Sequence, residues 1–139
     1  MDGLLVNLKL MGWIDNDLSR LREYCEVAAS GCNWTIPFNY PVFGRDAFRT
    51  ATGVHAAAVI KSYRKGDTEL ADLVYSGVPA GLFGLRQVIE IGPMSGKSNV
   101  VYWLESRGLE ATEDRVTRVY EKAKKSSAVL TENEVMELV

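Results

Sequence analysis

Apolar side chains recur at helical spacing near the start of the chain. A first helix is predicted over residues 3–13, because Leu4, Leu8 and Met11 fall on one face of such a helix. A second helix follows, and either Asp15 or Asp17 is placed to act as its N-cap. Its apolar stripe consists of Leu18, Leu21, Tyr24, Cys25 and Ala28. The pattern therefore predicts two amphipathic helices at this end.

The middle of the chain mixes loops, helices and short strands. Residues 35–44, TIPFNYPVFG, are expected to be an extended loop with a short strand at 40–44, because a residue before proline is pushed out of the helical region. The alanine-rich run 53–63 predicts a largely buried helix, and a shorter helix is expected at 68–74. The glycines of 75–84 interrupt regular structure, and a strand is predicted at 87–91.

Three further helices are predicted toward the end of the chain. The first begins at Ser95 or Ser98 and is stopped by Gly108; the next covers 112–125 and ends in lysines, which suit a helix C-terminus. The last begins at Thr131, since TENE is a capping box. We expect a mainly α (α+β) fold, a compact helical domain with a small two-stranded β element, as a single domain over residues 1–139.

Composition narrows the function classes. The 139 residues include 47% hydrophobic and 24% charged side chains, which is typical of a globular protein. The formal charge is -2, so no basic surplus exists to neutralise the phosphates of a nucleic acid. The chain has no apolar run of membrane-spanning length, and its first residues lack the pattern of a signal peptide. A cytoplasmic protein with neither nucleic acid nor membrane as a partner is expected.

Thiol and imidazole groups are scarce. Cys25 and Cys32 are the only cysteines and His55 is the only histidine, so neither a Cys/His zinc site nor a disulfide framework can be assembled. We expect reduced, structural cysteines. The alternative, a reactive thiol, would need an electropositive and partly exposed setting.

The glycine turn in GPMSGKS, residues 92–98, superficially resembles a phosphate-binding loop. A Walker loop has four residues between its glycines, whereas three separate Gly92 from Gly96, and Pro93 removes one N–H donor. A nucleotide cradle is therefore disfavoured. Two interpretations remain open: a structural turn from a strand into a helix, or an anion contact at the helix N-terminus assisted by Lys97.

Three segments together resemble a known family. They are GRDAFRTATGVHAAAVIK (44–61), VYSGVPAGLFG (74–84) and EIGPMSGKSNVV (90–101). In this order they are similar to the region that follows the catalytic barrel in 2-isopropylmalate, homocitrate and citramalate synthases. Residues 1–30 resemble the last barrel helix and the helix after it, and residues 40–139 resemble the post-barrel subdomains.

The resemblance implies an acyltransferase of amino-acid biosynthesis, leucine biosynthesis included. In that family a TIM barrel holds a divalent metal through an aspartate and an H-x-H pair, condenses an acyl-CoA with a 2-keto acid, and the thioester is then hydrolysed. Neither the barrel strands nor these metal ligands occur in this sequence. No cofactor is therefore expected in this chain; the divalent metal and the acyl-CoA are expected only with the missing barrel. A homodimer or a TIM-barrel partner is implied.

The resemblance also carries two catalytic residues over to this sequence, His55 and Tyr75. The histidine would move a proton to or from the acyl methyl group or the hydrolytic water. The tyrosine hydroxyl would donate to a developing oxyanion or orient the histidine. For His55 the alternative is a histidine packed on an alanine-rich helix. The inserted segment YRKGDTELAD (63–72) lengthens the path between the two residues.

A matching third turn, formed by Ser95, Gly96 and Lys97, is expected to be structural.

Two functions are compatible with these features. The first is the C-terminal portion or a fragment of an acyl-CoA/2-keto-acid condensing synthase, inert alone and completing the active site of a barrel. The alternative is a non-catalytic helical module for dimerisation or docking.

Overall fold

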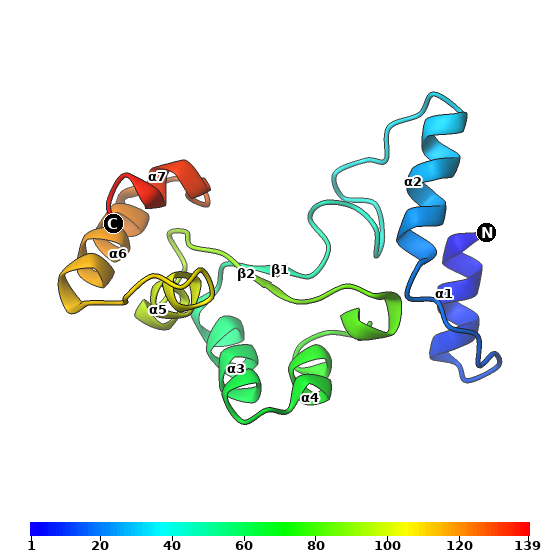
Figure 1. The fold of residues 1–139 in the computed structure, drawn as a ribbon, viewed down its shortest axis with the longest axis horizontal. Helices are drawn as coiled ribbons and strands as arrows, with labels where there is room; N and C mark the ends of the chain where they lie inside the picture. The colour runs from blue at the N-terminus through cyan, green and yellow to red at the C-terminus, as the bar shows by residue number, and fades with distance from the viewer. The chain divides into compact units, whose positions relative to one another are not determined.

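The computed structural model describes residues 1–139, and the fold is mainly helical with a small two-stranded sheet, as predicted (Figure 1). The chain forms two compact units. Unit 1 consists of Met1–Phe48 and Ser76–Gln87, and unit 2 consists of Arg49–Tyr75 and Val88–Val139. Both candidate catalytic residues lie in unit 2. The single domain expected over residues 1–139 stays a prediction. None of the helices is both long enough and apolar enough to cross a membrane.

Unit 1 is built around the helices α1 (Asp2–Leu10) and α2 (Leu21–Gly31) and a 3₁₀ turn at Ala80–Phe83. Its 3₁₀ turn ends at Gly84, whose φ of 67° is left-handed. A Cβ atom on this residue would lie 2.2 Å from the carbonyl oxygen of Ser19, so only glycine fits. The buried core consists of Val6, Leu18, Leu21, Phe43 and Phe83.

Both helices of unit 1 differ from the predicted bounds. Helix α1 stops before residue 13 because Gly12 turns the chain with a φ of 69°, and the Trp13 N–H donates to the Leu8 carbonyl (2.9 Å). The predicted cap of α2 was wrong, since this helix begins only at Leu21. Asp17 instead accepts the Ser19 N–H (2.9 Å) in the turn before it.

The strand predicted at 40–44 was also wrong. Its backbone groups are used locally: the Tyr40 N–H donates to the Pro37 carbonyl (3.0 Å), and the Gly44 N–H donates to the Tyr40 carbonyl (2.9 Å). A segment whose hydrogen bonds close on itself has none left for a neighbouring strand. The two prolines therefore favour a turn over the extended strand that the apolar residues suggested.

The sheet belongs to unit 2 and joins β1 (Arg49–Thr50) to β2 (Val88–Ile89) in parallel. Arg49 is paired with Val88 and Thr50 with Ile89. The Arg49 guanidinium also forms an ion pair with the Glu90 carboxylate. The strand predicted at 87–91 is thus confirmed, and its partner is β1 rather than residues 40–44.

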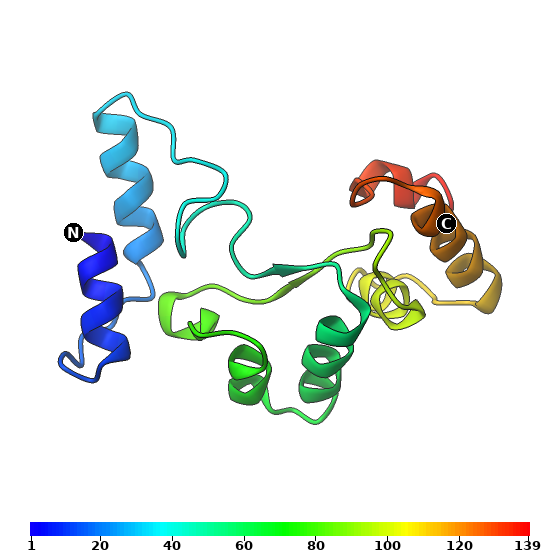
Figure 2. The same ribbon diagram turned by 180° about the vertical axis from the view of Figure 1, so that it is seen from behind.

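Between these strands run α3 (Gly53–Arg64) and α4 (Thr68–Leu73), which lie side by side in Figures 1 and 2. Asp67 caps α4 by accepting the Leu70 N–H (2.9 Å). Three residues join the helices, so their directions are opposed, as in an αα-hairpin. Their interface with β2 is formed by Ala56, Val59, Ile60, Ala71 and Ile89.

The remaining helices of unit 2 are α5 (Lys97–Glu105), α6 (Glu113–Lys125) and α7 (Glu132–Met136). Gly108 follows α5 with a φ of 72°, and the lysine-rich end of α6 and the capping box of Thr131 with Glu134 are confirmed. Their shared core consists of Ile91, Val100, Trp103, Leu104, Val116, Val119, Ala123, Leu130 and Val135.

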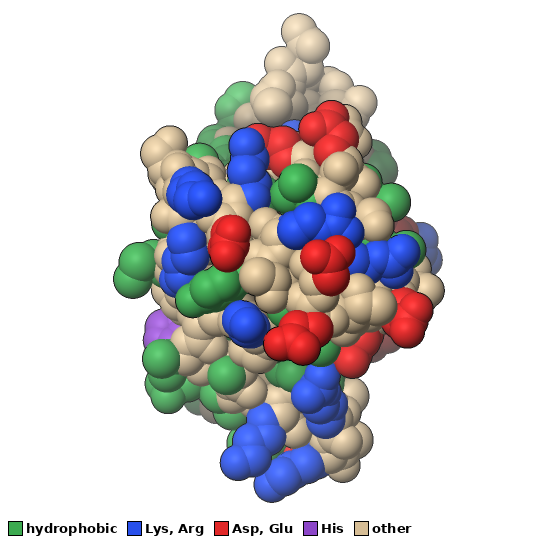
Figure 3. Space-filling view, turned by 90° about the vertical axis from the view of Figure 1, so that its left-hand side faces the viewer, with side chains coloured by type: hydrophobic (Ala, Val, Ile, Leu, Met, Phe, Trp, Pro, Cys, Tyr) green, Lys and Arg blue, Asp and Glu red, His purple; other side chains and the backbone are tan.

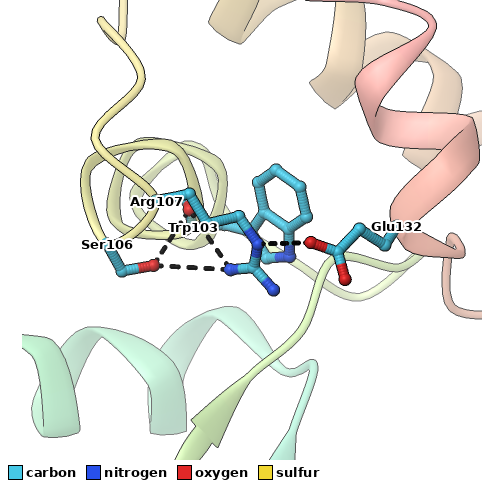
Figure 4. A network of polar contacts seen from close by, with 4 residues as sticks. All are labelled: Trp103, Ser106, Arg107 and Glu132. Atoms are coloured by element: carbon cyan, nitrogen blue, oxygen red, sulfur yellow. Dashed lines mark hydrogen bonds and ion pairs between the residues drawn. The ribbon is translucent and has the colours of Figure 1, made fainter.

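A network of polar contacts links the end of α5 to the start of α7 (Figure 4). The Arg107 guanidinium lies 3.7 Å over the Trp103 ring, and its Nε donates to Glu132 (3.0 Å). In the same network, the Ser106 hydroxyl donates to the Trp103 carbonyl (2.9 Å). Such an exposed ion pair contributes at most about 1 kcal/mol to stability. The main effect of Arg107 is therefore to cover the ring of Trp103, which belongs to the core.

Candidate functional site

The hairpin of α3 and α4, visible in Figures 1 and 2, carries His55 and Tyr75, whose rings are in contact. His55 lies in the first turn of α3, and Tyr75 comes two residues after the end of α4. In a helical hairpin the start of the first helix lies beside the end of the second. The inserted segment 63–72 therefore supplies the end of α3, the turn and most of α4, which return the chain to His55.

The two aromatic rings are stacked. Their centroids are 4.4 Å apart and their planes differ by 24°. Both side chains are exposed, Tyr75 by 67%, so His55 is not sealed in the core. Rings in such a contact meet face to face, an arrangement that fixes the plane of the imidazole without a hydrogen bond between phenol and imidazole.

The backbone of Tyr75 is in an unusual conformation for a residue with a side chain. Its φ is 57°, in the left-handed region that costs a non-glycine residue about 1–2 kcal/mol. Glycine would occupy this position without that cost. Strained positions of this kind cluster at functional sites, where the surrounding structure holds them in place.

The stack leaves reactive groups accessible. The imidazole nitrogens lie at the edge of the ring, away from the covered face, and each is able to accept or donate a proton. The Tyr75 hydroxyl is a hydrogen-bond donor on the rim of the same pair. Chemically, the arrangement offers one acid/base group and one donor on a single exposed surface of unit 2.

The first turn of α3 is in direct contact with the glycine turn before α5. A Cβ atom on Gly53 would lie 2.8 Å from the Gly96 backbone nitrogen, closer than real Cβ contacts allow. The Gly53 N–H also donates to the Met94 carbonyl (2.9 Å). Thus two of the matched segments, T-G-V-H and G-P-M-S-G-K, meet in space where the helix carrying His55 begins.

Neither serine considered as the N-cap of α5 has that role, because the N-cap is Gly96. Ser95 is buried, accepts the Gly92 N–H (2.8 Å) and donates to the Ala51 carbonyl (2.6 Å). The Gly96 N–H donates to the Asn99 side chain (3.1 Å). Two amides of this turn are therefore satisfied internally, which favours the structural interpretation over an anion contact.

This chain has no group of side chains arranged to bind a metal ion. No three His, Cys, Asp or Glu side chains come together in a way that could hold an ion, so the divalent metal implied by the family does not fit the residues present. Burial, with the neighbouring Asp2 carboxylate, raises the pKa of the Cys25 thiol, which makes it a poorer nucleophile at neutral pH. We assign no step to a metal or thiol of this chain.

Sequence reasoning missed two parts of this arrangement. It did not connect Ser95 with Ala51, and it did not find the contact of Gly53 with Gly96. A signal was present, since glycine at the first position of an otherwise alanine-rich helix weakens the helix unless close packing requires it. Nothing in the sequence indicated which backbone it would meet.

Comparison with known proteins gives three informative relatives. The chain is 30% identical to an (R)-citramalate synthase of Aquifex aeolicus over 77% of its own length and 19% of that protein. It is 27% identical to a homocitrate synthase of Methanothermobacter thermautotrophicus over 91% and 30%, respectively. It is 24% identical to a 2-isopropylmalate synthase of Erwinia tasmaniensis over 89% and 23%.

These matches cover much of this chain and little of each relative. No family model matches the chain. The curated relatives are aligned over 64–91% of it, whereas the chain spans only 16–30% of their length. The chain is therefore a homologue of the citramalate, homocitrate and 2-isopropylmalate synthases, consistent with a C-terminal region of that family.

Proposed function

We propose that this chain is the C-terminal part of an acyl-CoA/2-keto-acid condensing synthase and that His55 and Tyr75 complete the active site of its barrel. The observation that carries the proposal is the stacked contact of these two side chains, at 4.4 Å, on an exposed surface. Homology to three kinds of synthase supports the reaction class. The barrel would supply the divalent metal and bind the acyl-CoA.

Each residue then has a defined part. The His55 imidazole transfers a proton at the acyl methyl group or at the water that hydrolyses the thioester. The Tyr75 hydroxyl donates a hydrogen bond to an oxygen that gains negative charge. Its ring meanwhile holds the imidazole plane through the stack. Alone, the chain would be inert, because a general acid or base supplies only about 10²–10⁴-fold and no polarised substrate is present.

Docking is the second function that an observation favours. Unit 1 exposes several large apolar side chains, among them Trp13 (71%), Val27 (73%) and Trp34 (51%). Trp34 also lines a hollow of about 360 Å³ beside α2. A hollow lined mainly by apolar side chains, unlike single scattered ones, is typical of surfaces that bind another protein. A barrel partner or a second copy of the chain would cover them, with or without a catalytic role for His55.

Figure 3 shows one face of the molecule, on which basic and acidic side chains are interspersed. Acidic side chains lie among the basic ones over most of this face, and the formal charge of the whole chain is only -2. A face of this kind lacks the continuous basic patch that binds nucleic acid. Docking through the apolar side chains of unit 1 is therefore favoured over electrostatic binding to this face.

A chimera tests the proposed function. In the Aquifex aeolicus citramalate synthase, the 111 aligned residues are replaced by the corresponding residues of this chain, and citramalate formation is measured. We expect turnover in the chimera, and none in the same enzyme with those residues deleted. A folded chimera that is as inactive as the deletion would contradict the catalytic proposal and leave the docking function.

A further inference from the structure

Ser95 is a buried polar residue that hydrogen-bonds to Ala51, just before the N-cap of the helix that carries His55. Its side chain is only 2% exposed. The hydroxyl donates to the Ala51 carbonyl oxygen at 2.6 Å and accepts the Gly92 N–H at 2.8 Å. Ala51 directly precedes Thr52, the N-cap of α3. One hydroxyl thus joins the turn before α5 to the residue from which α3 departs.

A second hydrogen bond holds the other side of the same N-cap. The Gly53 N–H donates to the Met94 carbonyl at 2.9 Å. Residues 51 and 53 are therefore both tied to the 92–96 turn, and Thr52 is bracketed between them. His55 lies in the first turn of α3, so the direction of α3 after its N-cap determines the position of the His55 side chain.

The turn itself is held firmly by Asn99, which is completely buried. The Asn99 amide donates to the Glu90 carbonyl at 3.0 Å and accepts the Gly96 N–H at 3.1 Å. Buried polar groups that are all paired in this way favour one arrangement, because any displacement leaves a donor or acceptor unpaired. The turn is thus a fixed support for the start of α3.

We propose that Ser95 is a positioning residue for His55. Its hydrogen bond to the Ala51 carbonyl sets the start of α3 so that the imidazole meets the face of the Tyr75 ring. The consequence for catalysis rests on the proposed function, whereas the geometric effect does not. Displacing a catalytic group by about 1 Å is enough to cost up to about 10²-fold in rate.

His55 is the only histidine, so the Hε1 proton of its imidazole provides a single, unambiguous NMR signal in the full chain. Stacking on Tyr75 shifts this signal through the ring current, and Tyr75→Leu gives the position of the unstacked imidazole. In Ser95→Ala we expect the signal to move toward that position at temperatures well below the unfolding midpoint. A serine with a purely stabilising role would lower the midpoint and leave the signal of the folded protein unchanged.

Ser62→Ala is the matched control. Ser62 is also buried and also donates to a backbone carbonyl, that of Ala58, but it lies near the other end of α3. This variant should leave the imidazole signal in place. A second pair of variants covers the case in which Ser95→Ala does not fold. Gly53→Ala should shift the imidazole signal, because the Gly96 backbone obstructs a Cβ atom at residue 53. Gly96→Ala should leave the signal in place, because a Cβ atom has room there.

Kinetics in the chimera separate this inference from the proposed function. Ser95→Ala is expected to lower kcat by about 10–10²-fold with KM unchanged. An unmoved imidazole signal and unchanged kcat in Ser95→Ala, with His55→Ala still inactive, would overturn the positioning role alone. A moved signal together with normal turnover in His55→Ala would instead overturn the proposed function and leave the geometry intact.

Discussion

Replacing His55 by alanine is expected to lower kcat of the chimera by about 10²–10⁴-fold, the usual contribution of a general acid or base. The exposed imidazole packs only against Tyr75 among the aromatic side chains, so the free energy of unfolding should change little. Steady-state kinetics and urea unfolding of the same preparation measure the two quantities.

Tyr75→Phe should lower kcat by the same order, because the ring and its stack remain while the hydroxyl donor is lost. Tyr120→Phe is the matched control: it removes a hydroxyl from α6 in the same unit and should leave turnover unchanged. Normal turnover in both His55→Ala and Tyr75→Phe would leave these residues with a packing role only.

Leu104→Ala is expected to cause the largest loss of stability, about 2–5 kcal/mol in the free energy of unfolding. Leu104 is completely buried in the core shared by α5, α6 and α7. Removing its side chain loses apolar burial and leaves a cavity that the surrounding core side chains fill only in part. Urea unfolding followed by circular dichroism measures the change.

Leu73→Ala is the matched substitution for comparison. Leu73 lies on α4 in the same unit and is 49% exposed, so its truncation should cost less than about 1 kcal/mol. Equal losses in the two variants would mean that the core around Ile91 and Val119 does not provide the main packing of this unit.

Helices with local start and stop signals were predictable from the sequence. Thr131 caps α7 as expected, α6 ends in the expected lysines at Lys125, and the bounds of α3 and α4 follow the alanine-rich run and the Lys65–Asp67 turn. The misplaced features depend on backbone hydrogen bonds. Asp17 bonds to Ser19 instead of capping α2, and the predicted strand at 40–44 closes on itself. Local apolar patterns do not distinguish these outcomes.

His55 and Tyr75 could be chosen as candidates from the sequence, and their catalytic role stays a prediction, but their contact could not be foreseen. The motif T-G-V-H and the tyrosine turn identified His55 and Tyr75, and the structure places them in contact. Their stack depends on α3 and α4 folding back on each other, which the residue spacing alone did not indicate. The left-handed φ of Tyr75 was equally invisible, since sequence preferences disfavour that conformation for tyrosine.

Chemical rescue tests most directly whether the His55 imidazole transfers the proton. In the His55→Ala chimera, kcat is measured as the concentration of added imidazole is raised, with Tyr75→Phe as the parallel control. We predict that imidazole restores part of the turnover of His55→Ala and has no effect on Tyr75→Phe. A His55→Ala enzyme whose kcat stays low at every imidazole concentration would contradict the proton-transfer role.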